Sequence, residues 1–339
     1  MEKKVLRVAL IGAGGFGRWF HLSHIKQHSG FELVAIMDVN EMLLADLQKE
    51  NNIPVYTDLA QMLAEVKPDL CSIASPTKLH VPQSIACMEA GCDVFLEKPI
   101  GMTYEEGKQI LIKQKELGRK VMVHQPHRIC RETLAAEQII ASGKLGSIYM
   151  IKRNLSYYHR RDHWQGYKKN GGGNLANHGA HYIDQLLHLS GGKPTKASAV
   201  LRPLITTGDA DDMAKALIYT DNGITLDLDI NFVSAYTRNG LEILGTTGSA
   251  AMETDADGKF FFRVKYFDPN EWDLDNKNIP FREEIVDILS IPVIDYYDKC
   301  YAYYAEDHAP LVPIEETLLA MTAIDMCRAD SGEYESSFL

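Results

Sequence analysis

The stretch GGGNLANHGAHYID at residues 171–184 combines residue types that support three different chemistries. Glycines ahead of a helix can cradle a phosphate group. His178, His181 and Asp184, at short spacing, could instead hold a metal ion. A histidine in a cleft could also accept a proton from a substrate hydroxyl, because the ordinary pKa of histidine is about 6.5. These interpretations predict different proteins, so the elements that position the stretch must decide among them.

A glycine pattern near the N-terminus has a clearer structural context. The apolar run VLRVALIG leads into a GxGxxG, residues 18–28 can form a helix, and the next apolar run, 31–40, contains Asp38 at its end. A strand, a glycine turn, a helix and a second strand with an acid form the dinucleotide-binding fingerprint. We therefore predict that the turn binds the pyrophosphate of a dinucleotide through Gly12, Gly14, Gly15, Phe16 and Gly17.

Asp38 indicates which dinucleotide the turn binds. Its carboxylate can accept hydrogen bonds from the ribose diol of the adenosine. The same carboxylate would face the extra phosphate of NADP, and like charges about 4 Å apart repel by roughly 1 to 4 kcal/mol. No arginine follows at residues 39–44 to offset this repulsion. NAD is therefore predicted in preference to NADP.

Three further apolar runs end in turns that should border the same crevice, because ligands of open parallel sheets bind beyond the carboxyl ends of the strands. The candidate cofactor contacts on these turns are Ser75, Pro76, His80, Glu97, Lys98 and Gln125, with His124 beside them as a substrate contact. Lys98 could stabilise an alkoxide as an ammonium ion, although a solvated surface lysine is the alternative. His21, His24 and His28 share one helix stripe, which we interpret as packing rather than as a metal site.

The pattern changes after about residue 147. Strand-like segments at 147–158, 195–203, 214–232 and 241–254 include a hairpin signal at residues 221–223, and residues 300–330 return to helical spacing. A chain of 339 residues is long enough for two cores. We predict an NAD-binding domain at 1–125 and a substrate and oligomerisation domain at 126–339.

Five motifs in this order resemble the glucose-fructose oxidoreductase, inositol dehydrogenase and MocA family (Gfo/Idh/MocA) of NAD(P)-dependent oxidoreductases: GAGGFG at 12–17, SPTKLH at 75–80, EKP at 97–99, the stretch 171–184 and LEILGTTGSA at 241–250. The resemblance implies an α/β Rossmann domain with a doubly wound parallel sheet. It also implies a C-terminal α+β domain with an open, mostly antiparallel sheet that often supports oligomers. Lys98, before a proline in a turn that is commonly cis, would point at the substrate carbinol.

The second domain now limits the interpretations of residues 171–184. The glycines do not follow an apolar strand, so they suit a tight turn better than a second phosphate cradle. A helix from residue 175 would place Asn177, His181, Asp184 and His188 on one face. A metal site could be drawn from His181, Asp184 and His188. A dehydrogenase that already holds NAD needs no metal ion, however, so we predict none.

Oxidation of an alcohol requires that the hydroxyl lose its proton, and His181 is our candidate general base. Asn177 would hold the hydroxyl or orient a neighbour, and Asp184 would fix the tautomer of His181. Relatives in the family frequently carry Asp at the position of Asn177, so a relay through two acids is in doubt here. His178 would project from another face, where packing is an equally good interpretation.

Residues 159–169, HRRDHWQGYKK, combine aromatic and charged side chains that suit a sugar ring. The predicted substrate contacts are Lys98, His124, Arg161, Trp164, Asn177 and His181. A solvated loop at a subunit contact is the alternative for 159–169. The leading hypothesis is an NAD-dependent dehydrogenase that oxidises a secondary hydroxyl of a sugar, cyclitol or glycoside to a ketone. The alternatives are a reductase of a keto-sugar or other carbonyl, or a non-catalytic NAD-binding regulator.

The net charge of −11 and the lack of a basic run argue against nucleic acid as a partner. The six cysteines are scattered, as in reduced intracellular proteins. The N-terminal apolar run ends in glycines after about seven residues, too short for a secretion signal, and no run approaches a membrane span. We expect a cytoplasmic homodimer or homotetramer.

Overall fold

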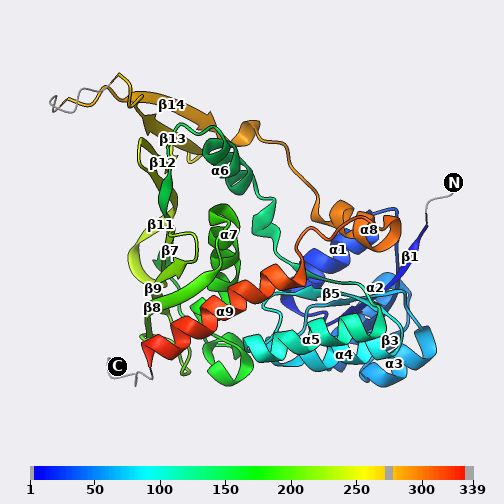
Figure 1. Ribbon diagram of the computed structural model, residues 1–339. Helices are drawn as coiled ribbons and strands as arrows, with labels where there is room; N and C mark the ends of the chain where they lie inside the picture. The colour runs from blue at the N-terminus through cyan, green and yellow to red at the C-terminus, as the bar shows by residue number, and fades with distance from the viewer. Residues whose placement is uncertain (1–3, 272–277, 333–339) are drawn as a thin grey trace. The chain divides into compact units, whose positions relative to one another are not determined.

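The computed structural model describes residues 4–271 and 278–332, which belong to two compact units (Figure 1). The first unit takes the chain up to residue 125 together with 169–171 and 295–321. The second takes 126–168, 172–294 and the chain from 322 onward. Both units are built from separated stretches of chain, and each is described by itself. The assignment of NAD binding to 1–125 and of substrate binding and oligomerisation to 126–339 stays a prediction.

A six-stranded parallel sheet forms the centre of the first unit, in the order β3-β2-β1-β4-β5-β6. Its strands are almost continuously apolar because helices cover both faces of such a sheet. The strands are β1 (Leu6–Ile11), β2 (Phe31–Met37), β3 (Val55–Tyr56), β4 (Leu70–Ile73), β5 (Asp93–Glu97) and β6 (Val121–His124). This order confirms the predicted doubly wound Rossmann sheet.

Helices pack on both faces of this sheet. In Figure 1, α3, α4 and α5 lie on one side of it and α1 and α8 on the other. The helix predicted after the glycine turn begins with a π turn, η1 (Gly17–Leu22), and continues as α1 (Ser23–Gln27). The other elements are α2 (Glu41–Asn51), α3 (Leu59–Val66), η2 (Thr77–Leu79), α4 (His80–Glu89), α5 (Tyr104–Leu117), α8 (Tyr296–Glu306) and the first part of α9 (Ile314–Ser331).

The second unit contains an eight-stranded sheet in the order β14-β13-β12-β11-β7-β10-β9-β8. Only the pair β7 and β10 is parallel among the described pairs, and all the others are antiparallel. The open, mostly antiparallel sheet is therefore confirmed. Its strands are β7 (Ile148–Tyr158), β8 (Pro194–Arg202), β9 (Met213–Thr220), β10 (Thr225–Asn231), β11 (Val233–Gly245), β12 (Gly248–Thr254), β13 (Phe260–Tyr266) and β14 (Arg282–Asp287).

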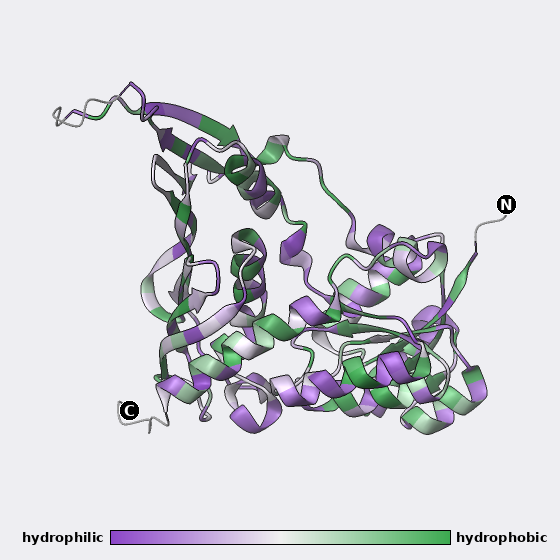
Figure 2. Cartoon of the chain, in the orientation of Figure 1, coloured by the Kyte–Doolittle hydropathy of each residue, from purple (hydrophilic) through white to green (hydrophobic). Residues whose placement is uncertain are grey.

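One face of this sheet is covered by α6 (Arg131–Ala141) and α7 (Ala180–Ser190), which Figure 1 shows along the same side. Strand β10 alternates accordingly: Leu226, Leu228 and Ile230 are buried, whereas Asp227 and Asp229 point to the other face. Most residues of α7 are buried, and hydrophobic colours predominate on it in Figure 2. The short turns of this unit are η3 (Pro126–Arg128), η4 (Trp164–Gly166), η6 (Leu175–Gly179) and η7 (Ile288–Ser290), with η5 (Lys168–Asn170) at the boundary with the first unit.

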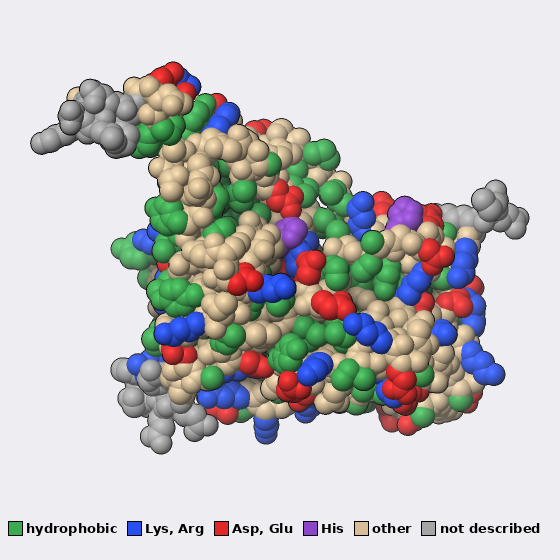
Figure 3. Space-filling view, in the orientation of Figure 1, with side chains coloured by type: hydrophobic (Ala, Val, Ile, Leu, Met, Phe, Trp, Pro, Cys, Tyr) green, Lys and Arg blue, Asp and Glu red, His purple; other side chains and the backbone are tan. Residues whose placement is uncertain are grey.

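The surface carries charges of both signs. On the described part of the face seen in Figure 3, Lys and Arg side chains are interspersed with Asp and Glu. Among residues 4–271 and 278–332, no helix combines the length and the apolar character needed to cross a membrane.

Candidate functional site

The glycine turn after β1 is held in a conformation that suits glycine. Gly12 has φ of +84°, and a Cβ at this position would lie 2.6 Å from the backbone nitrogen of Ser75. The turn is also tied to the end of β2, because Oδ2 of Asp38 accepts a hydrogen bond from the Ala13 amide at 2.8 Å. The other carboxylate oxygen accepts from the Asn40 amide at 3.0 Å. The fingerprint acid therefore lies directly beside the turn.

The structure places the predicted first-unit residues at one edge of the parallel sheet. This edge is formed by the carboxyl ends of β1, β2, β4, β5 and β6, and parallel strands present these ends on the same side. Glu97 and His124 are paired in register at the ends of β5 and β6. The residues brought to the edge are Gly12, Gly14, Gly15, Phe16, Gly17, Asp38, Ser75, Pro76, His80, Glu97, Lys98, His124 and Gln125.

His80 connects two of these turns. Its Nε2 lies 2.8 Å from the Ser75 carbonyl oxygen and its Nδ1 lies 2.7 Å from the Pro99 carbonyl oxygen. Burial lowers the pKa of His80, although the two carbonyl contacts oppose this shift. The Lys98–Pro99 peptide is cis, as the resemblance implies. His80 therefore fixes the turn that carries Lys98 relative to the turn that carries Ser75.

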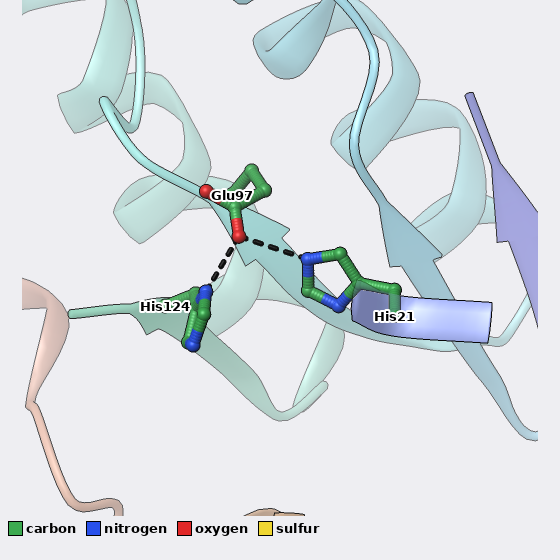
Figure 4. A group of neighbouring side chains, drawn as sticks. All are labelled: His21, Glu97 and His124. Carbon is green, nitrogen blue, oxygen red and sulfur yellow. Dashed lines mark hydrogen bonds and ion pairs between the residues drawn. The ribbon is translucent and has the colours of Figure 1, made fainter. Parts of the chain in front are cut away.

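Glu97 lies at the centre of a buried cluster, which we call the His–Glu–His cluster (His21, Glu97 and His124; Figure 4). Its Oε1 lies 2.8 Å from Nε2 of His21 and 2.5 Å from Nδ1 of His124. Burial alone would raise the pKa of Glu97, but electrostatic attraction to His124 and His21 and the hydrogen bonds accepted from both rings outweigh burial and hold that pKa well below its usual value. Burial lowers the pKa of His21. The cluster therefore contains a carboxylate that accepts from two rings.

The three ligand atoms of this cluster lie within 4.8 Å of one another, so a divalent ion could in principle be held there. Both nitrogen-to-oxygen distances are hydrogen-bond lengths, and an ion would have to displace a ring proton from each histidine. The hydrogen-bonded arrangement explains the geometry without an ion. His21 has a role that sequence reasoning missed; its place one turn after Gly17, on the helix that leaves the glycine turn, could have indicated it.

In the second unit, Asn177 lies on η6 and His181 near the start of α7, and both side chains are half-buried. The helix predicted from residue 175 therefore forms, but its first turn has π winding. Residues four apart lie on nearly the same face, so Asn177 and His181 remain neighbours. The ring of His181 lies 4.9 Å, centroid to centroid, from that of His127.

Asp184 anchors α7 to the η3 turn. Its two oxygens accept hydrogen bonds from Nε and Nη2 of Arg128 at 2.6 and 2.9 Å, and this ion pair is buried. The ring of His188 contacts Nη1 of Arg128 at 2.8 Å and the Glu137 carboxylate at 2.5 Å. Sequence reasoning gave Asp184 to the tautomer of His181 and did not anticipate Arg128. The network also engages Asp184 and His188, two of the three residues of this helix from which a metal site could be drawn.

The loop before the glycine stretch contains both a buried and an exposed candidate. Arg161 is 3% exposed, and its Nη2 donates to Oδ1 of Asn174 at 2.7 Å. Trp164, by contrast, is 38% exposed. Gly173 has φ of +102°, and a Cβ there would lie 2.1 Å from the Asp211 carboxylate, so the glycines do form a tight turn. Arg161 therefore anchors the loop, whereas Trp164 is partly exposed.

Two family models match the chain in succession. The model for the oxidoreductase family with an NAD-binding Rossmann fold, GFO_IDH_MocA, matches residues 6–125. The model for the GFO/IDH/MocA C-terminal domain matches residues 133–251. Together these models cover the parallel sheet and most of the second sheet.

Two individual proteins are also similar to parts of this chain. The D-glucoside 3-dehydrogenase of Escherichia coli (strain K12) is 31% identical over 195 residues, which is 56% of this chain and 56% of the relative. The chain thus spans about half the length of that relative. The 1,5-anhydro-D-fructose reductase of Ensifer adhaerens is 24% identical over 249 residues, which is 72% of this chain and 74% of the relative.

Among solved structures, the fold is similar to that of the WlbA dehydrogenase from Bordetella pertussis in complex with NADH and UDP-GlcNAcA. The TM-score is 0.83 at 23% sequence identity, with 98% of this chain and 96% of that chain covered. At this identity the similarity concerns the fold alone.

Proposed function

Because the chain belongs to the Gfo/Idh/MocA family of NAD-binding oxidoreductases, we propose that it is an NAD-dependent dehydrogenase acting on a secondary hydroxyl of a sugar, cyclitol or glycoside. The observation that carries this proposal is the single strand-end edge that holds the glycine turn, Asp38 and the Lys98–Pro99 turn. Relatives named as a glucoside dehydrogenase and an anhydrofructose reductase support the substrate class.

The residues of the edge fit a dinucleotide. The glycine turn opens a helix whose first amides can meet the pyrophosphate. A Cβ at Gly14 would have no atom within 4 Å among the described residues other than Gly14 and its chain neighbours. Asp38 would accept hydrogen bonds from the ribose diol and would disfavour the extra phosphate of NADP. Ser75, Pro76, His80, Glu97 and Gln125 would form the rest of the crevice. When bound, the nicotinamide supplies the hydride acceptor.

The protein's own groups would handle the proton. His181 would accept the hydroxyl proton as a general base, since an imidazole is matched to neutral pH. Lys98 would stabilise the developing alkoxide through its ammonium charge. Asn177 would hold the hydroxyl or orient a neighbouring group. In the reductive direction the same groups would deliver the proton to the carbonyl.

Recognition of the sugar would rely on an aromatic side chain and polar neighbours. The exposed indole of Trp164 can pack on the CH face of a ring. Arg161 would add a polar contact, although it already uses Nη2 to hold Asn174. His124, also predicted as a substrate contact, is almost fully buried and would face the cofactor instead. We also propose a cytoplasmic homodimer or homotetramer in which the uncovered face of the eight-stranded sheet forms an interface.

The test is a substrate panel. Cyclitols, free sugars, sugar acids and glycosides would be incubated with NAD and, in parallel, with NADP while reduced nicotinamide is recorded. We expect turnover with one class and a preference for NAD. The reverse reaction with keto-sugars would reveal a reductase. Tight binding of NAD without turnover in either direction would favour a non-catalytic NAD-binding regulator instead.

A further inference from the structure

One nitrogen of the His–Glu–His cluster, Nε2 of His124, takes no part in the hydrogen bonds within the cluster. His124 is 1% exposed, and its Nδ1 lies 2.5 Å from Oε1 of Glu97. Its Nε2 is buried and has no hydrogen-bond partner among the residues that the structure describes. A buried polar atom without a partner is unfavourable, so such an atom calls for an explanation.

The neighbours of His124 determine what Nε2 can do. Glu97 is a carboxylate and can only accept, so Nδ1 of His124 carries the proton. In the neutral ring this leaves Nε2 as a hydrogen-bond acceptor. Glu97 is itself fixed by His21, whose Nδ1 accepts from the hydroxyl of Tyr297 at 2.6 Å. The buried chain from Tyr297 to His124 therefore holds an acceptor in one orientation.

The position of His124 in the sheet indicates which ligand it would meet. Asp38, the predicted adenosine contact, follows β2 on one side of β1, whereas His124 ends β6 on the other side. The rings of Phe16 and Phe20 lie 6.0 and 5.1 Å from the His124 ring, centroid to centroid, and come from the glycine turn and the helix after it. A dinucleotide that crosses β1 would bring its nicotinamide end toward His124.

We propose that Nε2 of His124 accepts a hydrogen bond from the nicotinamide riboside half of the bound dinucleotide, either from a ribose hydroxyl or from a carboxamide N–H. This inference rests on the proposed function. Because Nε2 is covered, contact requires a neighbouring side chain to move. Phe16, which is 38% exposed and lies on the glycine turn itself, is the neighbour suited to do so.

Two amide variants separate the two nitrogens of the ring. In His124→Asn the amide N–H can replace Nδ1 and keep the bond to Glu97, but nothing replaces Nε2. In His124→Gln the amide oxygen can reach the place of Nε2. At about pH 8, where histidine is ordinarily neutral, we expect His124→Asn to raise the Kd for NAD by about threefold to tenfold, the size of one hydrogen bond. His124→Gln should bind more tightly than His124→Asn. His24→Asn is the matched control, and thermal melts check that each variant is folded.

The affinities of the wild type and His124→Asn for four nucleotides would identify the group that donates to Nε2. The nucleotides are NAD, its 3-acetylpyridine analogue, ADP-ribose and ADP. If His124→Asn binds NAD more weakly than the wild type but binds the other three nucleotides equally well, the donor is the carboxamide, because the analogue lacks the amide N–H. If His124→Asn binds NAD, the analogue and ADP-ribose more weakly than the wild type, the donor is a ribose hydroxyl. Equal affinities of wild type and His124→Asn for NAD, or an equal loss for ADP, would overturn the inference. If the wild type binds none of these nucleotides, the proposed function fails as well, and this outcome is distinct from the others.

Discussion

Two buried histidines at the strand-end edge, His21 and His80, make stability depend on pH. Burial lowers the pKa of each ring in the folded chain. The unfolded chain therefore binds more protons below its own histidine pKa of about 6.5, and acid favours unfolding. We expect the free energy of unfolding, measured with urea, to fall between about pH 7.5 and about pH 5.5. The His80→Asn variant should lose less stability over this interval than the wild type. An unchanged or rising free energy on acidification would contradict the assignment.

The proposed general base gives a second prediction for a single residue. Removal of a general base typically lowers the rate by about 10² to 10⁴. We expect His181→Ala to lower kcat by this amount with its melting temperature preserved. His188→Ala is a matched control on the same helix, since the ring of His188 is already engaged by Glu137 and Arg128. Near-normal turnover in folded His181→Ala would remove His181 from the mechanism.

At the scale of elements, helix α7 depends on a buried ion pair. Arg128 on η3 and Asp184 on α7 are both almost fully buried, so removal of one charge leaves the other uncompensated. We expect Asp184→Asn to cost about 3 to 5 kcal/mol in the free energy of unfolding. The exposed pair of Arg18 and Glu50 provides a control, and Glu50→Gln should cost less than about 1 kcal/mol. Similar costs for the two variants would show that α7 does not depend on this pair.

Part of the fold could be predicted from the sequence. Strands β1, β2, β4, β5 and β6 could be predicted, because each is an apolar run that ends in a distinctive turn. The fingerprint further required Asp38 to lie near the glycine turn, and its bond to Ala13 agrees with this. These features depend on residues close in the chain. They are the part of the fold that local pattern determines.

Contacts between distant parts of the chain could not be predicted in this way. Helix α8 joins the first unit, where the Tyr297 hydroxyl reaches His21 across 276 positions of sequence. The pairing of Arg128 with Asp184 similarly joins residues 56 positions apart. Neither pairing produces a periodic pattern in the amino-acid sequence. The π turns η1 and η6 depend on the same tertiary packing, because their sequences satisfy ordinary helical spacing.

At the scale of the whole molecule, two units of different architecture would divide the work. The first presents the glycine turn and Lys98 at one sheet edge, and the second carries His181 on a helix that its own buried ion pair anchors. The proposal assigns the cofactor to the first and the proton acceptor to the second.

The central claim is hydride transfer, and deuterium placed at the carbinol carbon would trace the transferred hydrogen directly. The protein would be incubated with NAD and fully C-deuterated sugars or cyclitols from the reactive class, and the mass of the reduced nucleotide would be determined. We predict that the reduced nicotinamide carries one deuterium, which comes from the carbinol carbon. The hydroxyl hydrogens, which exchange with water, are not transferred to it. Reduced nucleotide without deuterium, or no reduction with any member of the panel while NAD binds, would contradict the account.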